Sequence, residues 1–471
     1  MQPTAFTEHP EVEKILADLR SEFAPGKKEF IVSDVLDGEG HQYVNLVQEG
    51  GGVLGIALVG YTYILEQMGV RFINLAGTSA GAINTILISA TGSKKEEKSR
   101  AILEHLSNLN LFDLVDGFWL WRWLIRIMTT DRGFVKFLSL IIRSIVVLAI
   151  LLALASGIVY FMFPANPGLF KGMMIATLIF ILIVILLVVI VRVQMHRFYK
   201  TGWGLNPGIF FKNWMSKILE KNGAATVADW QIKIDEKPDL KMRSPRTEDI
   251  SDLKPEVCLI TSEISTQVKV EFPRMACLYW KNYKQVNPAE FVRASMSIPI
   301  FFETAKITNI PARDPDVIRH WKEMLSYDGE IPEKAMMVDG GLLSNLPINV
   351  FFNPNIDIAR LPTFGIMLED EDAKPKQNFS GFGSYLWAIF NTVRYYYDRD
   401  FLIKNNIFKK CIGRIDVRAF NWLNFNLSED EKIQLFIKGA EAAAIFLKGF
   451  DWPEYKNYRK AEKDRINVRK G

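Results

Sequence analysis

A serine held between glycines has the clearest chemical potential in this 471-residue sequence. Ser79 is the centre of Gly77-Thr78-Ser79-Ala80-Gly81, which follows a predicted strand, Phe72 to Ala76, and opens a predicted helix, Ala80 to Ala90. Glycines beside the serine allow a sharp turn without Cβ clashes, and a helix N-terminus favours developing negative charge. This context predicts a nucleophile elbow in which the Ser79 hydroxyl attacks an acyl carbon.

A glycine-rich loop lies between the predicted strand Tyr43 to Val47 and the predicted helix Gly55 to Met68. Its sequence is Gly50-Gly51-Gly52-Val53-Leu54-Gly55. Backbone N–H groups at Gly50, Gly51 and Gly52 are not screened by side chains, so they can hold the oxyanion of a tetrahedral acyl intermediate. A nucleotide-binding loop is the alternative, because the spacing fits G-x-G-x-x-G, but no Gly-Lys-Ser/Thr follows.

The general base is not expected to be a histidine. The sequence contains five histidines and none follows His320, whereas the usual hydrolase order of Ser, Asp and His places the histidine late in the chain. His320 lies in a polar stretch and would serve only in an unusual order. A histidine triad is therefore disfavoured.

Asp339 is the candidate base. It is the first residue of Asp339-Gly340-Gly341 and ends the apolar segment Ala335 to Val338, a predicted strand. If this strand is parallel to its neighbours, its carboxyl end meets theirs at one edge of the sheet, so Gly50, Ser79 and Asp339 converge. A simple Asp-Gly-Gly turn is the alternative.

These three elements, in this order, resemble the patatin-like phospholipases. The likeness extends to Gly204-Leu205-Asn206-Pro207-Gly208 and to the segment from Arg293 to Phe302, which contains Ala-Ser-x-Ser-x-Pro. The resemblance implies a three-layer α/β/α fold with a mainly parallel central sheet and a Ser-Asp dyad. The implied residues are Ser79 and Asp339 for catalysis, Gly50, Gly51 and Gly52 for the oxyanion, and Gly55, Gly77, Gly81, Gly340 and Gly341 as supports of the motifs.

The resemblance also implies an activity, namely phospholipase A or lysophospholipase on membrane phospholipid or lysophospholipid, with no cofactor and no metal. One departure is Leu54, where the family usually has a basic residue. A lipid transacylase with the same dyad and an inactive lipid-binding scaffold remain alternatives. The sequence does not indicate an oligomeric state.

Two long apolar segments predict an inserted transmembrane hairpin. Ser144 to Phe163 and Gly172 to Val191 each contain 20 residues without a charge, enough to cross about 30 Å of hydrocarbon as a helix. Two core helices or a re-entrant hairpin are the alternatives. Cations flank the hairpin on both outer sides, at Arg122, Arg126, Arg132, Lys136 and Arg143 before it and at Arg192, Arg197 and Lys200 after it.

This charge pattern places both flanks, and with them the catalytic domain, on the cytoplasmic side of an integral membrane protein. The segment Phe118 to Leu124 contains three tryptophans beside Arg122 and is expected at the headgroup layer. The connection between the apolar segments, Pro164 to Lys171, is short and rich in turn-forming residues.

The composition argues against other classes of protein. A net charge of +4 on 471 residues gives no reason to expect nucleic-acid binding. Cys258, Cys277 and Cys411 are far apart and predict neither a zinc site nor a disulfide framework. The acidic run Glu369 to Asp372 lacks EF-hand spacing and is expected to be a solvated loop.

The motifs divide the chain into five expected parts, with a capping box at Ser428 to Glu431 opening a helix near the C-terminus. They are an N-terminal helical segment (1–42), a first catalytic part (43–143), the hairpin (144–191), a second catalytic part with Asp339 (192–370) and a C-terminal helical region (371–471).

Overall fold

The computed structural model describes residues 1–130, 167–243, 253–353, 359–369 and 381–470, together with residue 250 and scattered positions between 143 and 158. Its centre is a mixed sheet with the strand order β12-β11-β2-β3-β6-β10-β9. These strands are Ile412–Asp416, Thr363–Glu369, Gln42–Gln48, Val70–Thr78, Val257–Glu263, Lys334–Asp339 and Ala305–Thr308. Shorter strands join the sheet at β1 (Val35–Leu36), β5 (Lys241–Met242) and β7 (Val268–Phe272), and β4 (Gly204–Asn206) pairs with β8 (Ile300–Phe302).

Five strands, from β12 to β6 in this order, are mutually parallel. The apolar segments that predicted strands around Tyr43, Phe72, Val257 and Phe364 form β2, β3, β6 and β11. β2, β3 and β11 are buried along almost their whole length, as expected for strands covered on both faces.

One strand direction differs from the prediction. β10, which ends at Asp339, is antiparallel to β6, with Asp339 opposite Thr261 and Val338 opposite Ser262. β6 continues beyond the end of β3, where Thr78 pairs with Ile260. β10 therefore runs toward the end of β3 along the part of β6 that extends past it. Its last residue, Asp339, lies at the level of Ser79. Convergence of parallel strand ends was the wrong reason for placing Asp339 near the serine, because an antiparallel strand of the right length brings it there.

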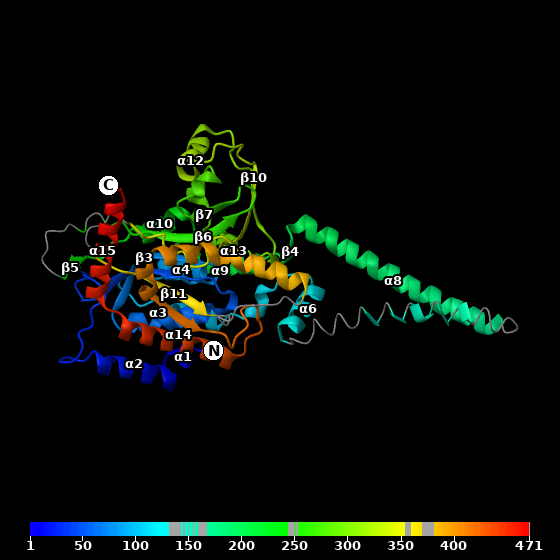
Figure 1. Ribbon diagram of the computed structural model, residues 1–471, viewed down its shortest axis with the longest axis horizontal. Coiled ribbons are helices and arrows are strands. Elements are labelled where there is room, and N and C mark those ends of the chain that lie inside the picture. Colours follow the sequence, from blue (N-terminus) through cyan, green and yellow to red (C-terminus); the bar gives the residue numbers. More distant parts are fainter. Residues whose placement is uncertain are drawn as a thin grey trace.

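Helices cover both faces of the sheet (Figure 1). The chain advances from β2 through β3 to β6 in one direction across the sheet, but it moves in the opposite direction from β11 to β12. With right-handed crossovers, α13 (Phe382–Lys404) then lies on the face opposite α3 (Gly55–Gln67) and α4 (Ala80–Ala90). α14 (Glu429–Gly449) packs along α3 and contacts β12.

The remaining helices lie around this core and in the segments that precede and follow it. They are α1 (Thr4–Thr7), α2 (Pro10–Glu22), α5 (Ser99–Ser107), α6 (Trp119–Thr130), α8 (Pro167–Thr201), α9 (Ile209–Lys221), α10 (Val227–Asp235), α11 (Ala289–Ser295), α12 (Pro315–Leu325) and α15 (Trp452–Lys470). Short 3-10 helices are η1 (Gly52–Leu54), η2 (Leu111–Leu114), η3 (Ala276–Leu278), η4 (Tyr283–Gln285), η5 (Gly340–Leu342) and η6 (Asn406–Cys411).

α8 projects away from the body of the molecule (Figure 1). Within it, Lys171–Lys200 is a 30-residue stretch that is long and apolar enough to cross a membrane, and none of its most apolar part is buried. It contains the predicted span Gly172 to Val191. The other predicted span, Ser144 to Phe163, lies largely outside the described residues, as do Arg132, Lys136 and most of the acidic run. Within the described part of the chain, one of the two predicted apolar spans is thus found as a helix long enough to cross a membrane.

The capping box before α14 is confirmed. The Ser428 hydroxyl accepts a hydrogen bond from the Glu431 amide at 3.2 Å, and the Glu431 carboxylate accepts one from the Ser428 amide at 2.7 Å. These two bonds satisfy amides that the first turn of a helix cannot use internally. Phe436, Ile437 and Ala440 of α14 are buried.

The packing of α14 on α3 depends on the absence of side chains at Gly60 and Gly439. A Cβ atom on Gly439 would overlap the carbonyl oxygen of Ala57, and one on Gly60 would overlap that of Phe436. Both obstacles are backbone atoms, so the helices would have to move apart. We expect Gly439→Ala to lower the free energy of unfolding by about 1–3 kcal/mol, measured by chemical unfolding of the detergent-solubilised chain.

The matched control for this prediction is Gly449→Ala on the same helix. No atom lies within 4 Å of the position that its Cβ would take, so this variant should be neutral or more stable, because alanine favours helix over glycine by up to about 1 kcal/mol. Equal stability of the two variants would contradict the close approach of α3 and α14.

Candidate active site

Ser79 occupies a strained turn between β3 and α4. Its backbone φ is 52°, a region that residues with a Cβ seldom adopt. The Ser79 amide donates a hydrogen bond to the Ser295 hydroxyl at 2.9 Å, and the Ser79 carbonyl accepts one from the Ile83 amide within α4. A strained backbone conformation of this kind is a feature of functional sites. The strand-turn-helix context matches the predicted elbow.

The glycines around Ser79 permit this turn. A Cβ on Gly77 would overlap the carbonyl oxygen of Gly81, and a Cβ on Gly81 would overlap that of Gln48 at the end of β2. The start of α4 therefore rests directly against the backbone of β2 and β3. The N-terminus of α4 has no side-chain cap, which leaves its positive end available to a developing negative charge.

Ser295, at the end of α11, fixes the elbow from behind. Its hydroxyl accepts from the Ser79 amide and donates to the Ile260 carbonyl of β6 at 2.6 Å. Two residues later, the carbonyl of Ser297 accepts a hydrogen bond from the Asp339 amide at 2.8 Å. One short segment thus holds the backbones of both candidate catalytic residues.

Arg293 in turn secures that segment. It is buried and donates hydrogen bonds to the Ser297 hydroxyl and to the carbonyls of Pro207 and Glu303. Burial lowers the pKa of Arg293 to about 10, which still leaves the side chain charged at neutral pH. The segment quoted for the family resemblance therefore has a physical role, which the sequence did not reveal.

Asp339 ends β10 and is buried beside Ser79. Its Oδ1 atom accepts a hydrogen bond from the Gly341 amide at 2.8 Å, and its Oδ2 atom has no hydrogen-bond partner among the described residues. Burial raises the pKa of Asp339, while the Ser79 hydroxyl, the Gly341 amide and the charge of Arg394 lower it. The hydroxyl is therefore close, but no hydrogen bond of good geometry joins it to the carboxylate, so Oδ2 is open to accept a proton.

The glycine loop follows β2, and its three glycines differ in what their amides do. The Gly50 amide donates to the Asn345 carbonyl at 3.1 Å, so the expectation that Gly50 itself holds the oxyanion is corrected here. Its role is to let the loop approach closely, because a Cβ there would lie 2.7 Å from the Asn345 amide oxygen. Within the described part of the chain, the amides of Gly51 and Gly52 have no partner and are the available donors.

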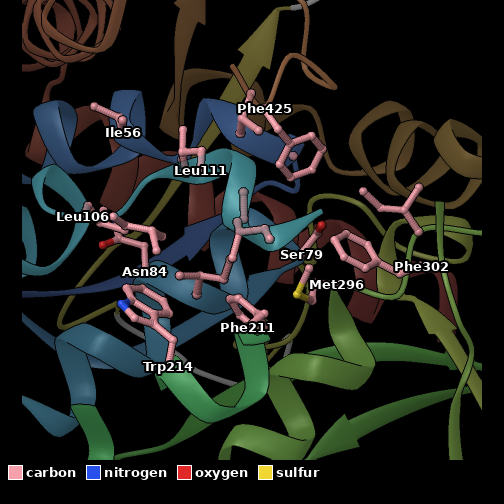
Figure 2. Close-up of a pocket in the computed structure, with 18 residues that line it drawn as sticks. Ile56, Ser79, Asn84, Leu106, Leu111, Phe211, Trp214, Met296, Phe302 and Phe425 are labelled. Carbon is pink, nitrogen blue, oxygen red and sulfur yellow. The ribbon is translucent and has the colours of Figure 1, made fainter. Parts of the chain in front are cut away.

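An apolar pocket opens at Ser79 (Figure 2) and encloses about 670 Å³ of empty space, including its mouth. Gly52 and Gly55 line it on the side of the glycine loop. The Ser79 hydroxyl lies among aromatic and aliphatic side chains, with Met296 and Phe302 near it and Trp214 farther along the pocket (Figure 2). Such a lining suits a hydrocarbon chain and not a nucleotide phosphate, which argues against the dinucleotide interpretation of the loop.

Two residues that sequence reasoning missed come from α13. The Arg394 guanidinium donates to the Gly50 carbonyl at 3.4 Å and lies over the Trp422 ring. The Asp398 carboxylate accepts hydrogen bonds from the Ser344 hydroxyl and from the next two backbone amides. Neither residue lies in a recognisable motif, because each acts only through contacts made after folding.

Other candidates lie elsewhere. His320 is on α12 and does not line the pocket. Cys258 and Cys411 are buried free thiols and Cys277 is partly exposed. Among the residues that the structure describes, no group of three or more His, Cys, Asp or Glu side chains is arranged to hold a metal ion.

The chain is similar in sequence and in structure to known proteins. One curated relative is "Uncharacterized protein YqhO" from Bacillus subtilis (strain 168), 23% identical over 409 residues, which are 86% of this chain and 98% of YqhO. A solved structure that aligns is VipD from Legionella pneumophila, with 14% identity and a TM-score of 0.39 over 91% of this chain and 72% of VipD.

A family model localises the similarity. Residues 46–143 match the model of the patatin-like phospholipases. The matched segment contains the glycine loop and Ser79 but ends before Asp339. The first part of the chain is therefore similar to a patatin-like phospholipase domain, which supports a lipid acyl hydrolase as the class of activity.

Proposed function

We propose that this protein is a membrane-anchored serine acyl hydrolase of the phospholipase A or lysophospholipase type, with Ser79 and Asp339 as its catalytic dyad. The observation that carries the proposal is a buried carboxylate beside a strained serine at an apolar pocket, with one carboxylate oxygen that has no hydrogen-bond partner among the described residues. The pocket accommodates the acyl chain of the substrate. The ester carbonyl then lies next to the serine.

The reaction has two halves. The Ser79 Oγ atom attacks the ester carbonyl while its proton passes to Asp339 Oδ2, and the negative oxygen of the tetrahedral intermediate accepts hydrogen bonds from the Gly51 and Gly52 amides. The intermediate collapses to an acyl-serine, and the departing alcohol takes the proton from Asp339. Water then attacks the acyl-serine and gives a proton to Asp339. The second tetrahedral intermediate collapses to release the fatty acid, and the departing Ser79 Oγ atom takes that proton back from Asp339.

The environment makes Asp339 a stronger base than an exposed aspartate. Burial raises its pKa, so the carboxylate holds a transferred proton more readily. Arg394 limits the rise in the pKa of Asp339, because its positive charge lowers the same pKa. A histidine is not required when the aspartate itself is adjusted in this way.

Membrane anchoring by α8 brings the active site close to its lipid substrate. The helix is exposed along its apolar stretch, and α6, before it in the chain, exposes Trp119 and Trp123. Tryptophan at such positions is typical of the headgroup layer. With the catalytic part on the cytoplasmic side, as the flanking cations favour, the anchor raises the local concentration of lipid around the pocket.

Replacement of either dyad residue tests the chemistry. We expect Ser79→Ala and Asp339→Asn each to lower fatty-acid release by at least about a thousandfold, the order expected when an acyl-transfer nucleophile or base is lost. The assay offers defined phospholipids, lysophospholipids, triacylglycerol and acyl-CoA to the purified chain. It also analyses acylated products, so that acyl transfer to a second lipid is separated from hydrolysis.

The exposed Asp316 on α12 provides the control, because Asp316→Asn should retain full activity. Fatty-acid release at the wild-type rate by the Ser79→Ala or Asp339→Asn variant would overturn the dyad. Release by none of the proteins, the wild type included, would favour the inactive lipid-binding scaffold.

The pH dependence of kcat/KM tests the role of Arg394. Asp339 must be ionised to accept a proton, so kcat/KM should fall as the pH decreases through the pKa of Asp339. Arg394→Gln removes a charge that lowers this pKa, so the acidic limb should move to higher pH. Arg394→Lys keeps the charge and should keep the limb close to its original position, and identical limbs for wild type and Arg394→Gln would contradict the coupling.

Charged substitutions in α8 test the anchor. Leu182 and Leu186 are exposed near the middle of the helix, where an arginine opposes insertion by about 3 kcal/mol. We expect the double variant Leu182→Arg, Leu186→Arg to be released from membranes by alkaline carbonate while the wild type stays. Ile232→Arg, at an exposed position on α10, is the control, and complete extraction of the wild type would disprove the anchor.

A further inference from the structure

The apolar pocket at Ser79 has polar side chains at both of its ends. Of the 18 residues that line it, only Ser79, Asn84 and Trp214 have nitrogen or oxygen atoms in their side chains. In Figure 2 the Asn84 and Trp214 side chains lie near Leu106, at the end of the pocket away from Ser79. The pocket therefore has a reactive hydroxyl at one end, two polar groups at the other, and hydrocarbon between them.

Asn84 lies on α4, the helix that begins at the elbow. Ala80, Ile83 and Asn84 all line the pocket, and their spacing places them on one face of the helix. Asn84 follows Ser79 by five residues, which corresponds to about 7.5 Å along the helix axis. When the ester carbonyl of a substrate is at Ser79, a middle part of the acyl chain therefore lies beside Asn84.

Only one of the two polar atoms of the Asn84 side chain is used. The Asn84 Nδ2 atom donates a hydrogen bond to the Gln48 side chain at 2.6 Å, and Gln48 in turn donates to the Thr85 hydroxyl at 3.1 Å. Gln48 and Thr85 do not line the pocket. Asn84 is 2% exposed, and its Oδ1 atom is buried without a hydrogen-bond partner among the described residues. A buried acceptor of this kind is destabilising unless a donor reaches it.

Trp214 supplies a donor at the same end of the pocket. It is half-buried on α9, and its indole N–H has no hydrogen-bond partner within the part of the chain that the structure describes. An acceptor and a donor together are complemented by a hydroxyl group, which both donates and accepts. A keto oxygen could only accept, and a methylene group would leave the Asn84 oxygen against hydrocarbon.

We propose that this pocket selects acyl chains that carry a hydroxyl group in the middle of the chain, which donates to Asn84 Oδ1 and accepts from the Trp214 indole. Asn84 and Trp214 are then specificity-determining residues, because a site built to hydrogen-bond a hydroxyl rejects a chain that lacks it. The inference rests on the proposed lipid hydrolase function and names its substrate class, but binding can be measured without turnover.

Competition binding tests the selectivity of the pocket. The full chain in detergent, with Ser79→Ala to prevent turnover, binds a fluorescent fatty acid that is displaced by stearic acid, by stearic acids hydroxylated at successive mid-chain carbons, or by the matching keto acids. We expect the best hydroxy acid to bind about tenfold more tightly than stearic acid, and the keto acid to gain less because it cannot donate to Asn84. If no hydroxy acid binds more tightly than stearic acid, the inference is wrong.

Two variants assign the preference to its residues, and the affinity ratio of the two acids within each protein cancels their different partitioning into detergent. Asn84→Leu removes the acceptor and should abolish the preference. Trp214→Phe removes the N–H but keeps an aromatic ring, so it should lower the preference several-fold. Trp280→Phe, at a half-buried position that does not line the pocket, is the matched control and should keep the ratio. If Asn84→Leu does not fold, Trp214→Phe decides, and an unchanged ratio in Trp214→Phe would refute the inference.

Turnover separates this inference from the proposed function. The wild type is offered lysophosphatidylcholine with a plain or a hydroxylated acyl chain, and we expect about a tenfold higher kcat/KM for the hydroxylated substrate. If neither substrate is hydrolysed but the hydroxy acid binds preferentially, the hydrolase assignment fails and the selectivity of the pocket stands. If both substrates are hydrolysed with the same kcat/KM through the dyad, the inference about the pocket fails alone.

Discussion

Burial of the Asp339 carboxylate is the constraint around which this structure is organised. An ionised carboxylate taken out of water carries a free-energy penalty of several kcal/mol unless hydrogen bonds and opposite charge offset it. For Asp339 this penalty is only partly offset. The Gly341 amide donates a hydrogen bond to one oxygen and Arg394 supplies positive charge, but the second oxygen has no partner among the described residues. The unpartnered oxygen is what a reacting serine can use, and the neighbouring loops must be rigid enough to keep it that way.

That rigidity comes from contacts between segments that are far apart in the sequence. Ser295 holds the backbone of Ser79, Ser297 holds that of Asp339, and the turn at Ser344 and Asn345 connects β3 with the glycine loop. The elements that could be predicted are those whose signals are local, such as the glycines that permit the elbow, the capping box of α14 and the apolar strands. A hydrogen bond between distant segments produces no periodic pattern in the sequence, so these contacts could not be predicted from it.

Two errors of prediction have the same origin. The direction of β10 depends on where β6 ends relative to β3, and the occupation of the Gly50 amide depends on the turn at Asn345. Both are properties of pairing partners and not of the residues themselves. The convergence of Ser79 and Asp339 was nevertheless anticipated, because the resemblance of the three motifs carried that information even though the argument from strand direction did not. The predicted span from Ser144 to Phe163 lies largely outside the described residues.

Two buried aspartates contact the loops of the proposed active site, and their hydrogen bonds give them different roles. Asp398 accepts three hydrogen bonds, one from a hydroxyl and two from amides, so both of its oxygens are committed to a turn. Burial nevertheless raises its pKa to about 6. The pKa alone would therefore make Asp398 look as suitable a base as Asp339. Geometry separates them, because a base needs an oxygen free to receive a proton at the reacting atom, and Asp339 alone of the two retains one.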